Sequence, residues 1–65
     1  MTQAQKDIVR AMARNNLNMT HTANELYRTF NCIAYHRGRL LDLYGLDMRK
    51  FYDLLKLLEL ADKDQ

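Results

Sequence analysis

The sequence contains no proline and no tryptophan, and only two of its 65 residues are glycine, Gly38 and Gly45. Proline and glycine are the residues that most weaken a helix, so long stretches of this chain carry nothing that would interrupt one. Strong helix formers such as leucine, alanine, lysine and arginine are frequent instead. A chain of this length holds one domain, near the lower size limit for a hydrophobic core. The composition predicts an all-α fold, a compact four-helix domain over residues 1–65 with a central helix-turn-helix.

Cysteine occurs once, at Cys32, so the chain lacks a cysteine pair for a disulfide and suits a reducing compartment. No apolar run approaches the ~18 residues that a membrane span requires. The N-terminus also lacks the apolar core of a signal peptide. We expect a cytoplasmic protein, or a domain of a larger cytoplasmic chain, with no membrane partner.

Catalytic and metal-binding patterns are equally scarce. The chain has no glycine-rich phosphate loop and no set of nucleophile, base and orienting residue. Cys32 and His36 stand four residues apart on one helix face, a spacing that zinc ligands use, but no second pair completes a four-ligand site. Cys32 is then a small residue on a helix face. We predict no catalytic residue, no metal, no cofactor and no small-molecule substrate, so the chain is not expected to be an enzyme.

The charge is unevenly distributed. The formal net charge is +2, with six basic and two acidic residues in positions 1–40 and four basic and six acidic residues in positions 41–65. A basic front and an acidic back favour a polyanion contacted through one side of the molecule. The alternative is ordinary solvated charge. The same two interpretations apply to a row of cations on the first predicted helix, which consists of Lys6, Arg10 and Arg14.

Apolar residues at three- and four-residue spacing predict a first helix over residues 3–15, with Thr2 as its N-cap. A second, short helix is predicted over residues 20–27. Thr20 is its expected N-cap, and Met19 would pack back onto the helix from just ahead of the cap.

A third helix is predicted over residues 29–44 after a tight turn. Thr29 is its expected N-cap, and Gly45 ends it, since glycine adopts positive φ without strain. Gly38 lies inside this helix, where glycine costs about 1 kcal/mol relative to alanine. The residues expected to face inward are Ile33, Leu40, Leu43 and Tyr44.

The fourth helix is predicted over residues 47–62, with Asp47 as its N-cap. Its apolar side chains cover more than one ~100° stripe, so one small core can hardly bury them all. They form two seams, namely Met48, Phe51, Leu55 and Leu58, and Tyr52, Leu54, Leu57 and Ala61. A wide exposed apolar patch marks an interface. We expect a homodimer whose interface contains Phe51, Tyr52, Leu54, Leu55 and Leu58. The alternative is that the first helix covers both seams.

From Thr22 to Met48 the residues run TANELYRTFNCIAYHRGRLLDLYGLDM. This segment resembles, without a gap, the C-terminal helix-turn-helix domain of PucR/CdaR-type bacterial transcription regulators, and more distantly the Fis-type DNA-binding domain. The elements that carry the resemblance are Thr22-Ala23, Leu26, Ile33-Ala34-Tyr35 and Gly45-Leu46-Asp47-Met48. The flanking helices also fall where that family has them. The resemblance implies a bacterial transcription-regulator domain whose third helix is the recognition helix.

The chain departs from the family pattern at several positions. Tyr27 stands where the family usually has glycine at the turn, and Arg28 stands where it has an aliphatic residue. Arg37 replaces a second aliphatic residue one turn past Ile33. Two basic positions common in the family's recognition helix are Phe30 and Ala34 in this chain.

The third helix also has the side chains that major-groove recognition needs. Its front half offers groups that reach base edges, including Asn31, which can pair bidentately with adenine. Cations nearby would neutralise phosphates, with His36 contributing when protonated. The predicted DNA-binding residues are Arg28, Thr29, Asn31, Tyr35, His36, Arg37 and Arg39. Two alternatives remain: the basic stretch is a solvated face, and Tyr35 packs inside.

A single unit contacts few phosphates, so we expect two units, joined through the last helix, to read half-sites about one helical turn apart on double-stranded DNA. The competing hypothesis is a helical protein-interaction or dimerisation module that has lost DNA binding. The wide apolar surface of the fourth helix and the displaced basic residues favour it.

Overall fold

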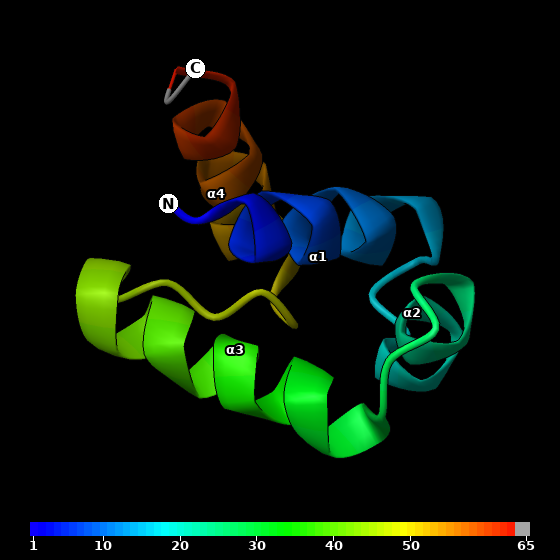
Figure 1. Cartoon of the computed structure of the whole chain (residues 1–65). Helices are drawn as coiled ribbons and strands as arrows, with labels where there is room; N and C mark the ends of the chain where they lie inside the picture. The colour runs from blue at the N-terminus through cyan, green and yellow to red at the C-terminus, as the bar shows by residue number, and fades with distance from the viewer. Residues whose placement is uncertain (64–65) are drawn as a thin grey trace.

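The structure, a computed structural model, describes residues 1–63 and contains four helices in that range. They are α1 (Gln3–Arg14), α2 (Met19–Glu25), α3 (Phe30–Tyr44) and α4 (Phe51–Lys63). Helix α1 crosses the middle of the molecule and packs against each of the others, while α2 also packs against α3 (Figure 1). Helices α3 and α4 lie on different sides of α1 and do not pack on each other. The expected all-α, four-helix fold with a helix-turn-helix of α2 and α3 is confirmed.

Helix α1 begins as its sequence predicts. The Thr2 hydroxyl accepts a hydrogen bond from the Gln5 amide (3.1 Å), and the Thr2 amide donates to Oε1 of Gln5 (3.0 Å), which completes a capping box. The helix ends at Arg14, one residue earlier than predicted. Asn16 and Leu17 then adopt positive φ, and the Leu17 amide closes the end by donating to the Met12 carbonyl (2.9 Å).

Helix α2 starts at Met19, and its cap is Asn18 rather than the predicted Thr20. Oδ1 of Asn18 accepts from the His21 amide (2.9 Å). The physical reason is Met19, which is 7% exposed and belongs to the core, so the helix must start one residue earlier to turn that side chain inward. The helix also ends earlier than the predicted residue 27, at Glu25.

The turn between α2 and α3 is built without glycine. Tyr27 has a φ of 54°, and the Arg28 amide donates to the Ala23 carbonyl (2.9 Å), the long hydrogen bond of a Schellman motif. The Tyr27 side chain is 98% exposed, so no packing compensates for the left-handed conformation. A non-glycine residue in this region costs on the order of 1 kcal/mol. PucR/CdaR-type domains, which the sequence resembles, usually have glycine at this turn. With tyrosine there, the turn of this chain forms with some backbone strain.

Helix α3 matches its prediction most closely. The Thr29 hydroxyl caps it by accepting from the Cys32 amide (3.1 Å), and Gly45, with a φ of 69°, ends it. Ile33 and Leu40 are fully buried as expected. The expectation that Leu43 and Tyr44 face inward is wrong, since they are 53% and 36% exposed. The last turn of α3 extends past the start of α1, and α4 does not lie over it (Figure 1).

Helix α4 begins at Phe51 instead of residue 47 or 48, and Asp47 is not its cap. The Asp47 carboxylate is engaged elsewhere, and the Asp47 amide donates to Oδ2 of Asp53 (3.1 Å). A turn follows in which the Lys50 amide donates to the Asp47 carbonyl (2.9 Å). This turn places the side chain of Met48 in the core, where it is fully buried.

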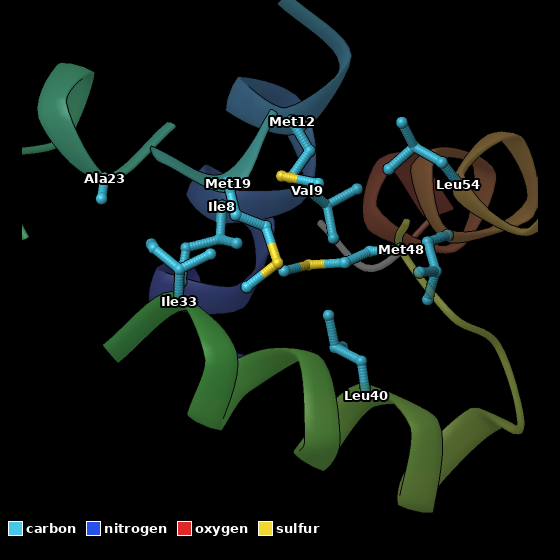
Figure 2. Packing of buried hydrophobic residues seen from close by; sticks show 10 residues of the cluster. Ile8, Val9, Met12, Met19, Ala23, Ile33, Leu40, Met48 and Leu54 are labelled. Carbon is cyan, nitrogen blue, oxygen red and sulfur yellow. The ribbon is translucent and has the colours of Figure 1, made fainter. Parts of the chain in front are cut away.

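The core is formed where α1 faces the other elements. Figure 2 shows Met48 in the middle of it, between the side chains of Met19, Leu40 and Leu54. The buried cluster consists of Ile8, Val9, Met12, Met19, Ala23, Ile33, Leu40, Met48, Leu54 and Leu57. Because α1 and this cluster hold α3 from its inner side only, the outer side of α3 faces solvent.

Candidate nucleic-acid interface

The outer face of α3 presents polar and basic side chains to solvent. Asn31, Tyr35 and Arg39 are exposed, as is Arg28 just before the helix. Tyr35 is 63% exposed, so the alternative that it packs inside is wrong. Its ring lies edge-on to that of His36, with 5.3 Å between the ring centroids. The side chains predicted to reach base edges thus share an accessible surface.

Two cations on this face are available to a ligand. Within residues 1–63, neither Arg28 nor Arg39 forms an ion pair. Nη1 of Arg28 lies 3.6 Å from Sγ of Cys32, a weak contact. Thr29 is also exposed, but its hydroxyl oxygen already accepts from the Cys32 amide. Its role in the structure is the helix cap, and its hydroxyl proton remains free to donate to another partner.

Arg37 was predicted to neutralise phosphates, and this prediction is wrong. Its Nε donates to Oδ1 of Asp47 (2.9 Å) and its Nη2 to Oδ2 (2.8 Å), a bidentate ion pair. The hydrogen bonds from Arg37 lower the pKa of Asp47 to about 2 and raise the pKa of Arg37. Asp47 is only 9% exposed, so the pair belongs to the fold. PucR/CdaR-type domains, which the sequence resembles, have an aliphatic residue at this position, whereas Arg37 pairs with an acid ten residues later.

His36 was predicted to add positive charge when protonated, and its surroundings oppose this near neutral pH. The side chain is half-buried, and its Nδ1 is buried without a hydrogen-bond partner among the described residues. Burial first, and the charge of Arg28 second, lower the pKa of His36 below its ordinary value. His36 is therefore neutral near pH ~7.

The cation row on α1 is largely paired. Arg10 lies 3.4 Å from Asp62 of α4, and Arg14 forms two hydrogen bonds with Glu25 of α2. Arg10 and Arg14 therefore pair with acidic side chains of this chain, as ordinary surface charges do. Both pairs are exposed and join α1 to its neighbours, where such pairs contribute little stability.

Arg49 is a further exposed cation that was not predicted from the sequence. This residue lies in the turn after Gly45, and the chain there runs back along α3 towards the middle of the molecule (Figure 1). Arg49 is exposed, has no ion-pair partner within residues 1–63, and lines a hollow together with Phe30, the first residue of α3. No local pattern indicates this position, since a fourth helix starting at residue 47 would have placed Arg49 on its first turn.

Helix α4 buries only part of its apolar surface in the core. Leu54, Leu57 and Ala61 are buried, whereas Phe51 and Tyr52 are 59% and 76% exposed. The alternative that the first helix covers both seams is therefore wrong. Leu54 is 4% exposed, so its assignment to a dimer interface is also wrong. The exposed remainder, here called the α4 patch, consists of Phe51, Tyr52, Leu55 and the half-buried Leu58.

Beside the α4 patch lies an apolar groove of about 230 Å³. Helix α1 and the loop after it form one wall, and α4 forms the other. The lining residues are Ala13, Asn16, Leu17, Phe51, Leu54, Leu55 and Leu58. Phe51, Leu55 and Leu58 belong to both, so the groove and the patch form one continuous apolar surface.

The described part of the chain shows neither a metal-ligand cluster nor a candidate membrane span. Residues 1–63 contain no group of three or more His, Cys, Asp or Glu side chains placed to hold a metal ion. None of the helices in this range has the length and apolarity needed to cross a bilayer.

The fold and surface define a small helix-turn-helix domain whose third helix exposes its outer face. Comparisons of the chain with known protein families, curated proteins and solved structures find no match.

Proposed function

We propose that this chain is the DNA-binding domain of a bacterial transcription regulator, with α3 lying in the major groove. The observation that carries the proposal is the outer face of α3, where Arg28, Asn31 and Arg39 are exposed and neither arginine has an acidic partner among the described residues. The resemblance to PucR/CdaR-type domains supports the same assignment.

The dimensions of this face suit a duplex. Arg28 precedes α3, and Arg39 lies nine residues after Phe30, the first residue of the helix, which corresponds to roughly 14 Å along its axis. The major groove is about 12 Å wide, so long side chains at the two positions reach phosphates on its opposite walls. Asn31 and Tyr35 lie between them on the same face and would meet base edges. Asn31 can donate to and accept from adenine at once.

A homodimer is the assembly we propose, through the α4 patch. The two exposed aromatic rings offer roughly 250 Å² of apolar surface, estimated from the 150–250 Å² that such a side chain buries. A standard interface takes about 800 Å² from each partner. We therefore expect weak association in solution that strengthens when two copies occupy half-sites about one helical turn apart.

The test is a fluorescence-anisotropy titration with duplex DNA at several salt concentrations. The variant Arg28→Ala/Arg39→Ala should lower the slope of log K against log salt by about 2, because each lost phosphate contact removes about 0.9. The matched control, Lys56→Ala/Lys63→Ala, removes the same charge from exposed positions on α4 and should keep the wild-type slope. Circular dichroism checks that both variants stay folded. Absence of salt-sensitive wild-type binding at tens of micromolar (~10⁻⁵ M, within the range of ordinary non-specific binding) refutes the proposal.

The second candidate function is a helical protein-interaction module. The α4 patch and its neighbouring groove favour it, because contiguous exposed apolar surface is where a protein partner binds. A chemical-shift map separates the two. DNA-dependent shifts at Arg28, Asn31 and Arg39 support DNA binding. No DNA-dependent shift there, with concentration-dependent shifts at Phe51 and Tyr52, supports the interaction module.

A further inference from the structure

We propose that the hollow between the start of α2, Phe30 and Arg49 is a phosphate-binding site for the DNA backbone, in which Arg49 holds the phosphodiester. This inference rests on the proposed function and adds to it a cation outside α3. The hollow has a volume of about 340 Å³ and is open to solvent. Its lining residues are Asn16, Leu17, Asn18, Met19, Thr20, Phe30 and Arg49.

The charge of the hollow suits an anion. Arg49 is the charged residue of the lining, and no acidic side chain lies among the others. Arg49 also forms no ion pair within residues 1–63. A guanidinium offers several N–H donors in a fixed plane, which match two oxygens of one phosphate. The unpaired charge therefore faces a space large enough for its natural ligand.

Neutral hydrogen-bond donors line the same hollow. Oδ1 of Asn18 is occupied by the His21 amide, so the side-chain NH₂ of Asn18 remains free to donate. Thr20, which is not the helix cap, is exposed, and its hydroxyl has no hydrogen-bond partner among the described residues. A phosphate oxygen only accepts hydrogen bonds, so a cation with donors around it is the chemistry that binds it.

The backbone of Arg49 is held by the fold while its side chain stays exposed. Oδ1 of Asp47 accepts from the Arg49 amide (3.0 Å) as well as from Nε of Arg37 (2.9 Å). Met48, between them, is fully buried. The anchored turn therefore places Arg49 beside Phe30 with little freedom to move away. Little backbone entropy is then lost on binding.

The position of the hollow favours DNA over a free anion. Phe30 adjoins Asn31 in the first turn of α3, so the hollow flanks the part of α3 that would meet base edges. The strand that passes this end of the helix in the major groove brings its phosphates there. Arg28 and Arg49 would then contact the backbone near the start of α3, and Arg39 would contact it farther along.

The test uses the whole chain and a labelled duplex of about 20 base pairs, with affinity measured between about 50 and 200 mM salt. Arg49→Gln should raise Kd about 5- to 10-fold and lower the salt slope by about 0.9, the loss of one phosphate contact. Lys56→Gln is the matched control, because it removes one exposed, unpaired charge from α4. It should leave the wild-type slope unchanged.

A second variant adds charge without disturbing the fold. Asn18→Asp keeps the helix cap, since aspartate and asparagine cap equally well, but puts a negative charge in the hollow. It should weaken DNA binding about as much as Arg49→Gln. Thr2→Asp is its control, because it adds the same charge at the cap of α1.

The outcomes distinguish the two proposals. Equal salt slopes for Arg49→Gln and Lys56→Gln, with wild-type binding intact, would overturn the phosphate site and leave the proposed function standing. A wild-type chain without salt-sensitive binding would remove both. Weakened binding by Asn18→Asp and Arg49→Gln, but by neither control, supports the site in the hollow.

Discussion

The Arg37–Asp47 ion pair makes a quantitative prediction about acid stability. The pKa of Asp47 is about 2 in the folded chain, against an ordinary value of 3.8. Each pKa unit is worth about 1.4 kcal/mol, so the interactions of the ionised carboxylate stabilise the fold by about 2 kcal/mol. Asp47 is 9% exposed, so solvent screening reduces this figure little. That is a large share of the margin of a domain this small.

The sign follows from the direction of the shift. The folded-state pKa of Asp47 is depressed, so its contribution is complete above the unfolded-state value near 4 and is lost as the pH falls through about 2. About half of it should be gone by pH ~3. Asp47→Asn should accordingly lower the free energy of unfolding by about 2 kcal/mol near pH ~7 and by far less near pH ~2.

The assay is urea denaturation followed by circular dichroism at a series of pH values. The informative quantity is the difference between wild type and Asp47→Asn, since other carboxylates titrate equally in both. Asp42→Asn serves as the control, because Asp42 is an exposed acid on α3 with no ion pair in the described chain. A difference between wild type and Asp47→Asn that stays constant from pH ~7 to pH ~2.5 would refute the reasoning.

Three further predictions concern backbone strain and the α4 patch. Tyr27→Gly should raise the free energy of unfolding, measured by urea denaturation, by about 0.5–1 kcal/mol, because glycine adopts the φ of 54° without strain and the tyrosine side chain is 98% exposed. The control Arg28→Gly should lower the free energy of unfolding in the same assay. Gly38→Ala should stabilise the folded chain by about 1 kcal/mol in thermal melts, because an added Cβ meets nothing within 4 Å. Gly45→Ala should destabilise the folded chain, because alanine is strained at the φ of 69° found there. Tyr52→Ser should weaken self-association in sedimentation equilibrium without unfolding the chain, and a wild type that stays monomeric at about 1 mM would contradict the dimer.

Those parts of the fold that depend on neighbours in sequence were predictable. Thr2 and Thr29 are followed by uninterrupted helical periodicity, and Gly45 stands where that periodicity stops, so the bounds of α1 and α3 followed to within one residue. The start of α2 was harder. Asn18 and Thr20 are both good caps, and the choice between them depends on the burial of Met19, which is a tertiary effect.

In the candidate site too, the features that follow from sequence spacing were predictable, and those that depend on tertiary partners were not. Periodicity correctly placed Asn31, Tyr35 and Arg39 on the outer face of α3, because a helix face follows from spacing alone. Spacing says nothing about partners, so the pairing of Arg37 was missed. The half-buried surroundings of His36 were missed for the same reason.

Asp47 links these errors. Its place after Gly45 predicts a helix cap, but its carboxylate binds Arg37 from ten residues earlier and the Arg49 amide from two residues later. The helix then cannot start at Asp47, and α4 begins at Phe51. In the proposed complex with DNA, these contacts of Asp47 also change which cations can reach the phosphates. Arg37, in the middle of α3, is neutralised by Asp47, while the turn that Asp47 anchors displays Arg49 beside the start of α3. Three arginines face the DNA backbone in this complex, the same number as predicted from the sequence. Arg28 and Arg39 are two of the predicted ones, and Arg49, beside the first turn of α3, takes the place of the third.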